Sequence, residues 1–326
     1  MSRGTVIGLA IIVGGFALCF WLPDRFEAYH VTLASLILIN VMLAVSLQVT
    51  NGLTGLFSLG HPAFMTVGGY LAAILTYPAR RKSFMMPELP SWLAGVEWSL
   101  APALVVGALG AGLLALVVGV AVLRLRGHYL AVATLGLIVI VRVVTNNLDG
   151  WTRGGLGLSG VPRLTDLATV WLATSLTIAL AWRLKHASLG RAMMAIRENE
   201  MAARCMGIDA FALKLLAFVI GAVLAGIAGA LTVHQISVIT PASYGIPLAF
   251  NLVVMIVAGG LGSITGAIVA AVTLSLLAEL LKPLEEAFGL YGLSQLLLAL
   301  LLILVLRLRP KGLFGSAEPP FLRSTG

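Results

Sequence analysis

The chain alternates between long apolar runs and short polar stretches, and this pattern sets the first structural expectation. Leu, Val, Ala, Ile and Gly dominate each apolar run. A helix that crosses the hydrocarbon core of a bilayer, roughly 30 Å thick, needs about 20 apolar residues. We therefore predict about ten hydrophobic segments, with soft boundaries where a run is short: residues 5–22, 34–49, 61–76, 101–122, 129–144, 167–182, 212–233, 246–258, 263–281 and 290–306.

These segments predict an all-α polytopic membrane protein. Lipid offers no partner for backbone amides, so only helices and closed barrels span it, and the alternating pattern of barrel strands is absent. Hydrophobic residues make up 60% of the 326 residues and the mean hydropathy is +1.03. We expect one transmembrane domain over residues 1–326, with a polar loop at 183–210 and a polar tail at 307–326.

The first apolar run could be mistaken for a signal peptide, since Arg3 precedes it. It ends in "CFWLPDRF" without a small-residue cleavage pattern, so we interpret it as the first span. The two cysteines, Cys19 and Cys205, lie in separate segments and indicate neither a disulfide framework nor a metal site.

Basic residues mark the cytoplasmic side of short loops. They gather in the 183–210 loop, in "RLRGH" (124–128) and in "RLRPKGLFG" (307–315), which predicts that both termini and the 307–326 tail are cytoplasmic. The stretch "ARRKSF" disagrees, because its basic residues fall in a loop expected outside; either the third segment is re-entrant or the count is wrong there. The net charge of +8 is thus mostly a topology signal and does not indicate nucleic-acid binding.

Glycine interrupts the apolar segments in two places, "NGLTGLFSLGH" (51–61) and "AGGLGSITGA" (258–267). Paired interruptions in corresponding halves are typical of transporters built from inverted repeats, with broken or re-entrant helices beside the substrate path. Close packing of helices through small residues explains the same glycines equally well.

A charged segment, "MMAIRENEMAARCMGIDAF" (193–211), stands out because only 10% of the chain is charged. Residues 192–206 contain neither Gly nor Pro and are rich in helix formers, which predicts one short helix. Glu200 and Arg204 are spaced as a favourable helical pair, and Gly207 supplies a stop. Ala202 and Ala203 would leave a small-residue surface for another protein, although composition alone favours an ordinary solvated loop helix.

The sequence contains no recognisable site that could supply the energy for transport. A P-loop needs a Gly-Lys pair, and none of the five lysines follows a glycine. Ion-coupled carriers usually bury carboxylates in the membrane, but only Glu279 falls inside an apolar segment, and Arg142 is the only basic residue deep in one. Both lie near enough to a segment end to snorkel to the interface, so the energy should come from a partner.

The segment at 188–231, "SLGRAMMAIRENEMAARCMGIDAFALKLLAFVIGAVLAGIAGAL", resembles the cytoplasmic loop and following span of the permeases of branched-chain amino-acid ABC importers, LivM type. Five further motifs match this family in order and spacing: "GLTGLFSLGHPAFMTVGGYLAA" (52–73), "RLRGHYLAVATLG" (124–136), "RGGLGLSGVP" (153–162), "VVMIVAGGLGSITGAIVAA" (253–271) and "RPKGLFG" (309–315). The resemblance therefore covers nearly the whole chain.

In ABC importers this loop carries a coupling helix that fits a groove in the ATPase subunit. Its general pattern is Glu-Ala-Ala, three residues, then Gly; here the matching positions are Met201, Ala202, Ala203 and Gly207, with the acid displaced to Glu200. The resemblance thus implies a set of ATPase-coupling residues: Arg197, Glu198, Glu200, Ala202, Ala203, Arg204 and Gly207.

Candidate residues for the substrate path are the polar and glycine positions at the two interruptions: Thr54, Ser58, His61, Asn251, Gly259 and Gly260. Each also has an ordinary structural explanation. A lone His is more often a capping or interhelical donor, Ser and Thr often bond to their own helix, and Asn251 and Asn40 need only face protein rather than lipid.

The resemblance implies a permease subunit in the bacterial inner membrane, and no enzyme. Its expected partners are the bilayer, a second LivH-like permease, two cytoplasmic ATP-binding subunits and a periplasmic solute-binding protein; ATP and Mg²⁺ would sit on the ATPases. Branched-chain amino acids are the expected solute, with urea, short amides or aromatic acids as alternatives. An ion-coupled carrier using Glu279 and Arg142 is the other open hypothesis.

Overall fold

The computed structural model describes residues 14–16, 19, 26–125, 128–289, 292–309, 312–315 and 318. The segment predicted at residues 5–22 lies almost wholly outside these ranges. The nine other predicted segments each coincide with a helix: α2 (Ala28–Leu47), α3 (His61–Thr76), α6 (Leu100–Val122), α7 (His128–Asn147), α9 (Leu167–His186), α12 (Ala210–Ile236), α13 (Ile246–Gly259), α14 (Ile264–Phe288) and α15 (Leu293–Leu308).

Short elements connect these helices. They include α4 (Ala79–Met85), α5 (Ser91–Ala94), α8 (Asp149–Thr152), a 3-10 turn η2 (Gly154–Leu156), α10 (Ser188–Glu198) and α11 (Glu200–Cys205). Strands β1 (Leu158–Ser159) and β2 (Val238–Ile239) form one antiparallel pair. The structure therefore confirms the all-α prediction, and six of the described helices are long and apolar enough to cross a membrane.

Helix α12 is the centre of the bundle and packs most extensively against α3 and α6. Small residues permit this close packing: a Cβ added at Gly68 of α3 would lie 2.4 Å from the Gly226 carbonyl oxygen of α12. The series Gly221, Ala225 and Gly229 is buried, so this face of α12 packs against its neighbours through small residues.

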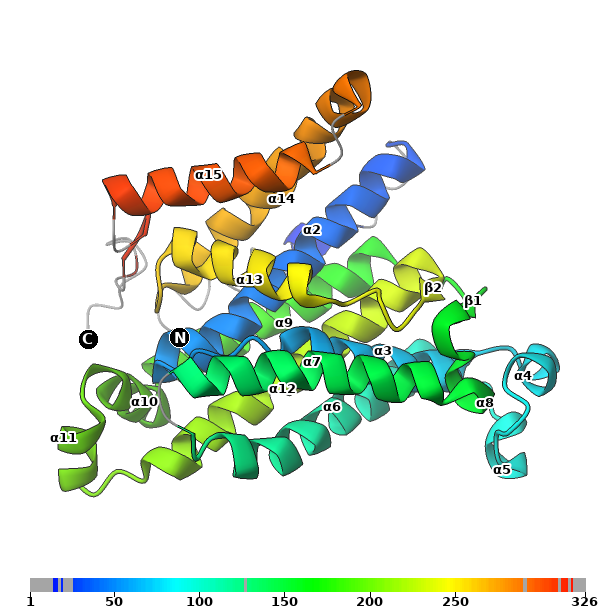
Figure 1. Ribbon diagram of the computed structural model, residues 1–326, viewed down its shortest axis with the longest axis horizontal. Coiled ribbons are helices and arrows are strands. Elements are labelled where there is room, and N and C mark those ends of the chain that lie inside the picture. Colours follow the sequence, from blue (N-terminus) through cyan, green and yellow to red (C-terminus); the bar gives the residue numbers. More distant parts are fainter. Residues whose placement is uncertain are drawn as a thin grey trace.

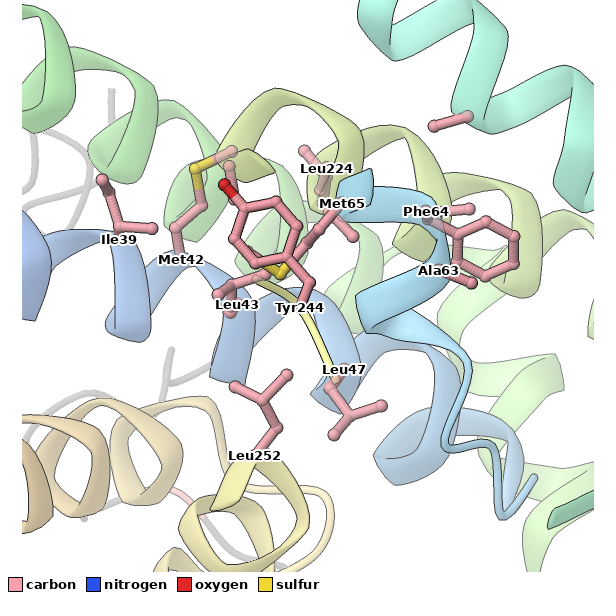
Figure 2. Packing of buried hydrophobic residues seen from close by; sticks show 14 of the residues in the cluster. Ile39, Met42, Leu43, Leu47, Ala63, Phe64, Met65, Leu224, Tyr244 and Leu252 are labelled. Carbon is pink, nitrogen blue, oxygen red and sulfur yellow. The ribbon is translucent and has the colours of Figure 1, made fainter. Parts of the chain in front are cut away.

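A buried apolar core joins α2, α3 and α12 (Figure 2). The Tyr244 side chain, from the connection between β2 and α13, points into this core among Met42, Leu43 and Met65. Its hydroxyl donates a hydrogen bond to the Gly229 carbonyl at 3.2 Å, so its polar end is satisfied without water. The connection is thereby fixed against the bundle.

The outward faces of the helices are also apolar. Aliphatic side chains are exposed along α6, α7 and α15, for example Val117, Ile140 and Leu304. A soluble monomer rarely exposes contiguous apolar surface of this extent, whereas lipid solvates it readily. Arg142 is exposed on α7 close to the end of that helix, so its side chain can reach the interface.

The loop elements gather at two opposite ends of the molecule (Figure 1). α10 and α11 lie at one end, which we call the coupling end, and α4, α5, α8 and the strand pair lie at the other, the outer end. Helix α3 ends towards the outer end, where α4 follows it. The basic stretch of residues 80–82 therefore lies at the outer end, against the charge rule.

One of those basic residues, Lys82, has a structural role inside the folded chain. Lys82 is fully buried in α4, and its Nζ donates hydrogen bonds to the carbonyl oxygens of Val96 and, at 3.3 Å, of Leu93. Burial lowers the pKa of the Lys82 ammonium. This lysine ties α4 to the end of α5, so it contributes less to the topology signal than its sequence position suggests.

Several boundaries differ from the predicted ones. α2 begins at Ala28 rather than at residue 34, α9 continues to His186, and α14 continues through Pro283 to Phe288. The charged and polar residues of these extra turns lie at helix ends, where long side chains reach water. Apolar runs therefore underestimated helix length wherever a helix emerges from the hydrophobic layer.

Candidate functional site

The charged segment forms two short helices at the coupling end, α10 and α11. The prediction of one helix over residues 192–206 is wrong, because Asn199 leaves the helical conformation with φ −157° and ψ 103°. Its side-chain oxygen instead accepts the backbone N–H of Ala202 at 3.0 Å and caps α11. Asn is a weak helix former and a strong N-cap. Its preference for the N-cap position therefore outweighed the helix propensity of the neighbouring residues.

The predicted stop at Gly207 is confirmed. Gly207 has φ +80°, its N–H donates to the Arg204 carbonyl at 3.0 Å, and the N–H of Ile208 donates to the Ala203 carbonyl at 3.2 Å. These two bonds form a Schellman motif, which favours glycine at the left-handed position. The segment therefore turns sharply into α12 without a flexible linker.

Glu200 links α11 to α12. Its carboxylate accepts from Arg204 at 2.6 Å, which confirms the predicted helical pair, and from Lys214 of α12, also at 2.6 Å. The hydrogen bond from Lys214, assisted by Arg204, lowers the pKa of the Glu200 carboxyl. The spacing in the sequence predicted the pairing with Arg204. It did not predict the pairing with Lys214, because that residue belongs to the next helix.

The exposed face of α11 differs from the predicted one. Ala203 is buried among apolar side chains of α10 and α12, whereas Ala202 is exposed. The prediction that both alanines present a small-residue surface is therefore wrong for Ala203. Met201 and Met206 are 73% and 82% exposed, so flexible thioether side chains dominate the surface available to a partner.

Arg197, at the end of α10, points back into the bundle. Its Nη1 donates to the Gly52 carbonyl at 2.8 Å and its Nη2 pairs with Glu198 at 2.7 Å. Added Cβ atoms would lie 2.8 Å from Arg197 Cγ at Gly55 and 2.3 Å from Arg197 Nη1 at Gly262. The guanidinium therefore occupies space that the two glycine-rich stretches leave open, and it touches both.

The first glycine-rich stretch, residues 48–60, interrupts the path from α2 to α3, and we call it the first break. It begins with a π-helix, η1 (Gln48–Gly52), and continues as mostly buried, non-helical backbone over residues 55–60. Asn51 holds this backbone: its Nδ2 donates to the Ser58 carbonyl at 3.0 Å and its Oδ1 accepts the Ser58 N–H at 3.2 Å. Thr134 of α7 accepts the N–H of Leu59 at 3.0 Å.

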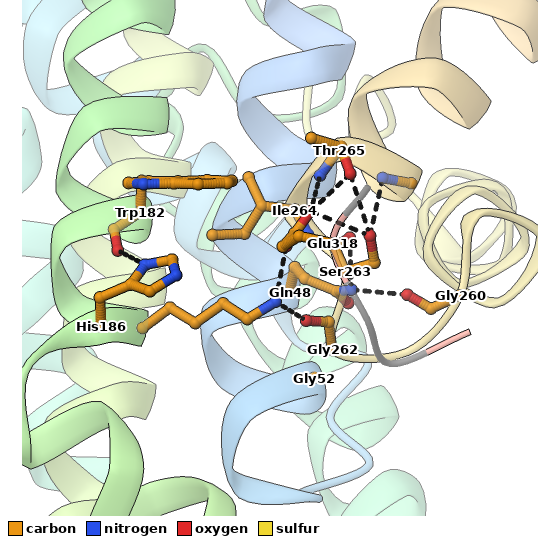
Figure 3. Close-up of polar contacts among 12 residues, drawn as sticks. Gln48, Gly52, Trp182, His186, Gly260, Gly262, Ser263, Ile264, Thr265 and Glu318 are labelled. Carbon is orange, nitrogen blue, oxygen red and sulfur yellow. Dashed lines mark hydrogen bonds and ion pairs between the residues drawn. The ribbon is translucent and has the colours of Figure 1, made fainter. Parts of the chain in front are cut away.

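The second break, residues 260–263, separates α13 from α14 and lies against the first. Gln48 Nε2 donates to the carbonyl oxygens of Gly260 at 2.8 Å and Ser263 at 2.9 Å (Figure 3). From α9, Lys185 Nζ donates to the Gly262 carbonyl at 2.6 Å. The two breaks predicted from glycine content thus meet at one place, at the coupling end.

Glu318 of the C-terminal tail completes the second break. Its carboxylate accepts the backbone N–H groups of Ile264 at 2.8 Å and Thr265 at 3.3 Å, and pairs with Lys185 at 2.5 Å (Figure 3). Burial opposes ionisation, but the hydrogen bonds led by that from Lys185 outweigh it and lower the pKa of the Glu318 carboxyl. A negative charge at the N-terminus of α14 is also favoured by the helix dipole. Glu318 is therefore part of the folded bundle.

The structure divides the predicted path residues between these elements. Thr54, Ser58 and His61 are buried in or beside the first break, where Thr54 bonds to the Thr50 carbonyl at 2.6 Å and His61 packs against Phe64. Gly259 and Gly260 are buried at the second break against Gly266 and Gly315. Asn251, on α13, lines a cavity. A role for any of them in the path stays a prediction.

The family model described as "Branched-chain amino acid transport system / permease component" matches residues 29–306. This chain is a member of that family. It is 30% identical to the high-affinity branched-chain amino acid transport system permease protein LivM of Escherichia coli (strain K12), covering 91% of this chain and 72% of that protein. LivM of Salmonella typhimurium is also 30% identical, covering 93% and 74%. No solved structure matches.

Membership explains the apolar outer surface: the chain is a multi-pass membrane permease, and permease subunits are not themselves enzymes. The chain is also 25% identical to LivH of Salmonella typhimurium, covering 85% of this chain and 91% of LivH. Similarity to both LivM and LivH indicates a permease pair. Among the described residues, no three His, Cys, Asp or Glu side chains gather as a metal site requires.

Proposed function

We propose that the protein is the permease subunit of a bacterial ABC importer for branched-chain, hydrophobic amino acids. It lies in the inner membrane with the coupling end and both termini in the cytoplasm. A second, LivH-like permease lies beside it, two ATP-binding subunits dock at the coupling end, and a periplasmic binding protein delivers the solute. ATP and Mg²⁺ bind to the ATPases, and this chain binds no cofactor.

One observation carries the coupling part of this proposal: α10 and α11 present Met201 and Met206 outward and Arg197 inward. The outward face offers adaptable apolar contacts to a separate protein. The inward guanidinium contacts both breaks, where α2, α3, α13 and α14 end. A displacement of α10 by the ATPase would therefore act on four helices through one side chain.

The breaks suit this role because their backbone polar groups are satisfied by side chains rather than by continuous helix. Gln48 of the first break donates to two carbonyl groups of the second, so a displacement of one break is transmitted to the other. Non-helical backbone at membrane depth is tolerated only where protein or water satisfies it, and here protein does. We infer that the inner ends of the four helices open and close together.

The test replaces the outward methionines, as Met201→Asp with Met206→Asp. Because both side chains are largely exposed, the variant should insert and fold normally. We expect it to lose copurification of the ATP-binding subunits and at least tenfold of ATP-dependent leucine uptake in proteoliposomes. Phe84→Asp is the matched control, since Phe84 is 82% exposed but lies at the outer end, and it should retain the ATPases.

Normal ATPase copurification by the double variant would overturn the docking surface. Leucine uptake by this chain alone under an ion gradient, without any ATPase, would support an ion-coupled carrier instead. Competition of labelled leucine uptake by urea, short amides and aromatic acids distinguishes the substrate classes.

A further inference from the structure

A cavity of about 230 Å³ lies between α2, α13 and α14. It extends over Leu33–Asn40 of α2 and the second half of α14, so it lies towards the outer end. Its volume is below the 300–1,000 Å³ typical of pockets for drug-sized ligands. The site therefore suits a small solute, and it lies on the side from which an importer receives one.

Most of the cavity wall is aliphatic. Leu33, Leu36 and Ile37 come from α2, while Val254 and Leu274 come from α13 and α14. These side chains form a surface that matches a branched hydrocarbon group and offers no hydrogen bond to a polar one. The wall therefore selects for an apolar portion of the solute.

Amide groups interrupt this wall at mid-depth. Asn40 Nδ2 donates to the Ser275 hydroxyl at 3.0 Å, which joins α2 to α14. Asn251 faces the same cavity from α13, and its amide makes no hydrogen bond to any described residue. The Asn251 side chain is exposed, so its amide is available to hydrogen-bond with water or with a polar group of a solute in the cavity.

The mouth of the cavity carries one charge of each sign. Glu279 and Lys282, one turn apart on α14, pair at 2.6 Å, and the Tyr29 hydroxyl donates to Glu279 at 2.6 Å. The Lys282 side chain is 59% exposed, so its ammonium can turn towards another carboxylate. Adjacent opposite charges match the two charged groups of a zwitterion, whereas a single charge would match only one.

We propose that this cavity is a membrane site for a zwitterionic aliphatic α-amino acid. The solute ammonium binds Glu279, its carboxylate binds Lys282, and its side chain lies on the aliphatic wall beside Asn251. This assignment rests on the proposed function and specifies how the permease itself, rather than the binding protein alone, recognises the solute.

The experiment uses the assembled importer in nanodiscs, with Asn251→Cys in a Cys205→Ser background. Cys205 is exposed and would react, whereas Cys19 is buried. We expect L-leucine to slow modification of the cavity cysteine by a small methanethiosulfonate reagent. The analogues 4-methylpentanoate and 3-methylbutylamine, which lack the ammonium and the carboxylate respectively, should protect at least tenfold less well. Adding Glu279→Gln should weaken leucine protection at least tenfold.

Phe250→Cys is the matched control, because Phe250 is exposed on the same helix but does not line the cavity. Its modification should not respond to leucine. Equal protection by all three compounds would mean an apolar cavity without zwitterion recognition and would overturn the proposal. So would the absence of leucine protection, or a cavity cysteine that is unreactive only when the second permease is present, because that subunit would then cover this face.

The outcomes separate the two proposals. If uptake depends on ATP and on Met201 and Met206 but leucine gives no protection, the cavity assignment fails while the importer function stands. If leucine protects the cavity but uptake does not need the ATPases, the site stands and the coupling proposal fails.

Discussion

The two breaks interrupt neighbouring spans at the same end of the molecule, but different chemistry holds each of them. Neutral side chains hold residues 55–60 of the first break: the Asn51 amide pairs with both backbone groups of Ser58, and Thr134 accepts the next backbone N–H. The second break depends on an ion pair, because Lys185 and Glu318 bind its carbonyls and amides from two distant parts of the chain.

This difference indicates which of the two breaks can change its conformation more easily. The residues that hold the first break are buried, and most of them are close to it in sequence. Their contacts are therefore lost only when the whole helix bundle unfolds. The residues that hold the second break come from the end of α9 and from the tail. Removing one partner of a buried ion pair causes a large loss of stability, because the other charge stays buried without a counter-ion. We expect the second break to be the more easily perturbed of the two.

The largest effect should follow Lys185→Met, which keeps side-chain volume but leaves Glu318 buried without its counter-ion. The expected loss of stability is about 3–5 kcal/mol. It should appear as a lower melting temperature in detergent and faster hydrogen exchange at the amides of Ile264 and Thr265. Glu318→Gln, which retains a capping oxygen, should be milder. Slow exchange at those amides in Lys185→Met would show that the ion pair does not hold this break.

Asn51→Ala should have the next largest effect, and it should act on the first break alone. Both backbone groups of Ser58 would lose their buried partner, at about 1–3 kcal/mol for each unsatisfied group. Hydrogen exchange should accelerate at Ser58 but not at Ile264. Equal acceleration at both positions would mean that the breaks are one cooperative unit, not two with separate supports.

Arg197→Lys tests the contact that the two breaks share, which is the guanidinium group of Arg197. Lysine keeps the charge but lacks the planar fork that serves both Gly52 and Glu198. We expect about 1 kcal/mol of lost stability but a several-fold fall in leucine uptake, measured beside an unchanged basal ATPase rate. Arg191→Lys, an exposed position on the same helix, is the control. Full uptake by Arg197→Lys would remove this residue from the coupling path.

The smallest effect concerns Glu200, whose ion pairs are with Arg204 and Lys214 rather than with a residue of either break. Because its pKa is lowered in the folded chain, the carboxylate stabilises α11 above its ordinary pKa of 4.5 and loses this contribution as pH falls through the lowered value. Solvent exposure limits the contribution to under about 1 kcal/mol. Exchange at α11 amides should therefore rise only in acid below pH 4.5, and Glu200→Gln should abolish that pH dependence while leaving the breaks unchanged.

The apolar pattern predicted the helices well because burial in lipid requires the same composition along a whole span. It also located both breaks, since Gly55, Gly260 and Gly262 adopt positive φ values that favour glycine. The pairing of Glu200 with Arg204 followed from helical spacing alone. These features depend on neighbours within a few residues, so the sequence carries them directly.

The long-range contacts could not be predicted in this way. Lys185 and Glu318 are 133 residues apart, and Asn40 and Ser275 are 235 apart. Glu318 belongs to a polar tail that composition describes only as cytoplasmic. The cavity was equally hidden, because Asn251 and Glu279 belong to different helices that come together only through tertiary packing.

The position of Glu318 has a consequence for biogenesis. This carboxylate follows α15 in the sequence, so the ribosome synthesises every described helix before the residue that caps α14. Until then, the N–H groups of Ile264 and Thr265 lack the carboxylate that accepts them, and the ammonium of Lys185 lacks its counter-ion. Arrested nascent chains that stop before residue 318 should therefore remain susceptible to proteolysis at residues 260–263, and extension past it should remove that susceptibility.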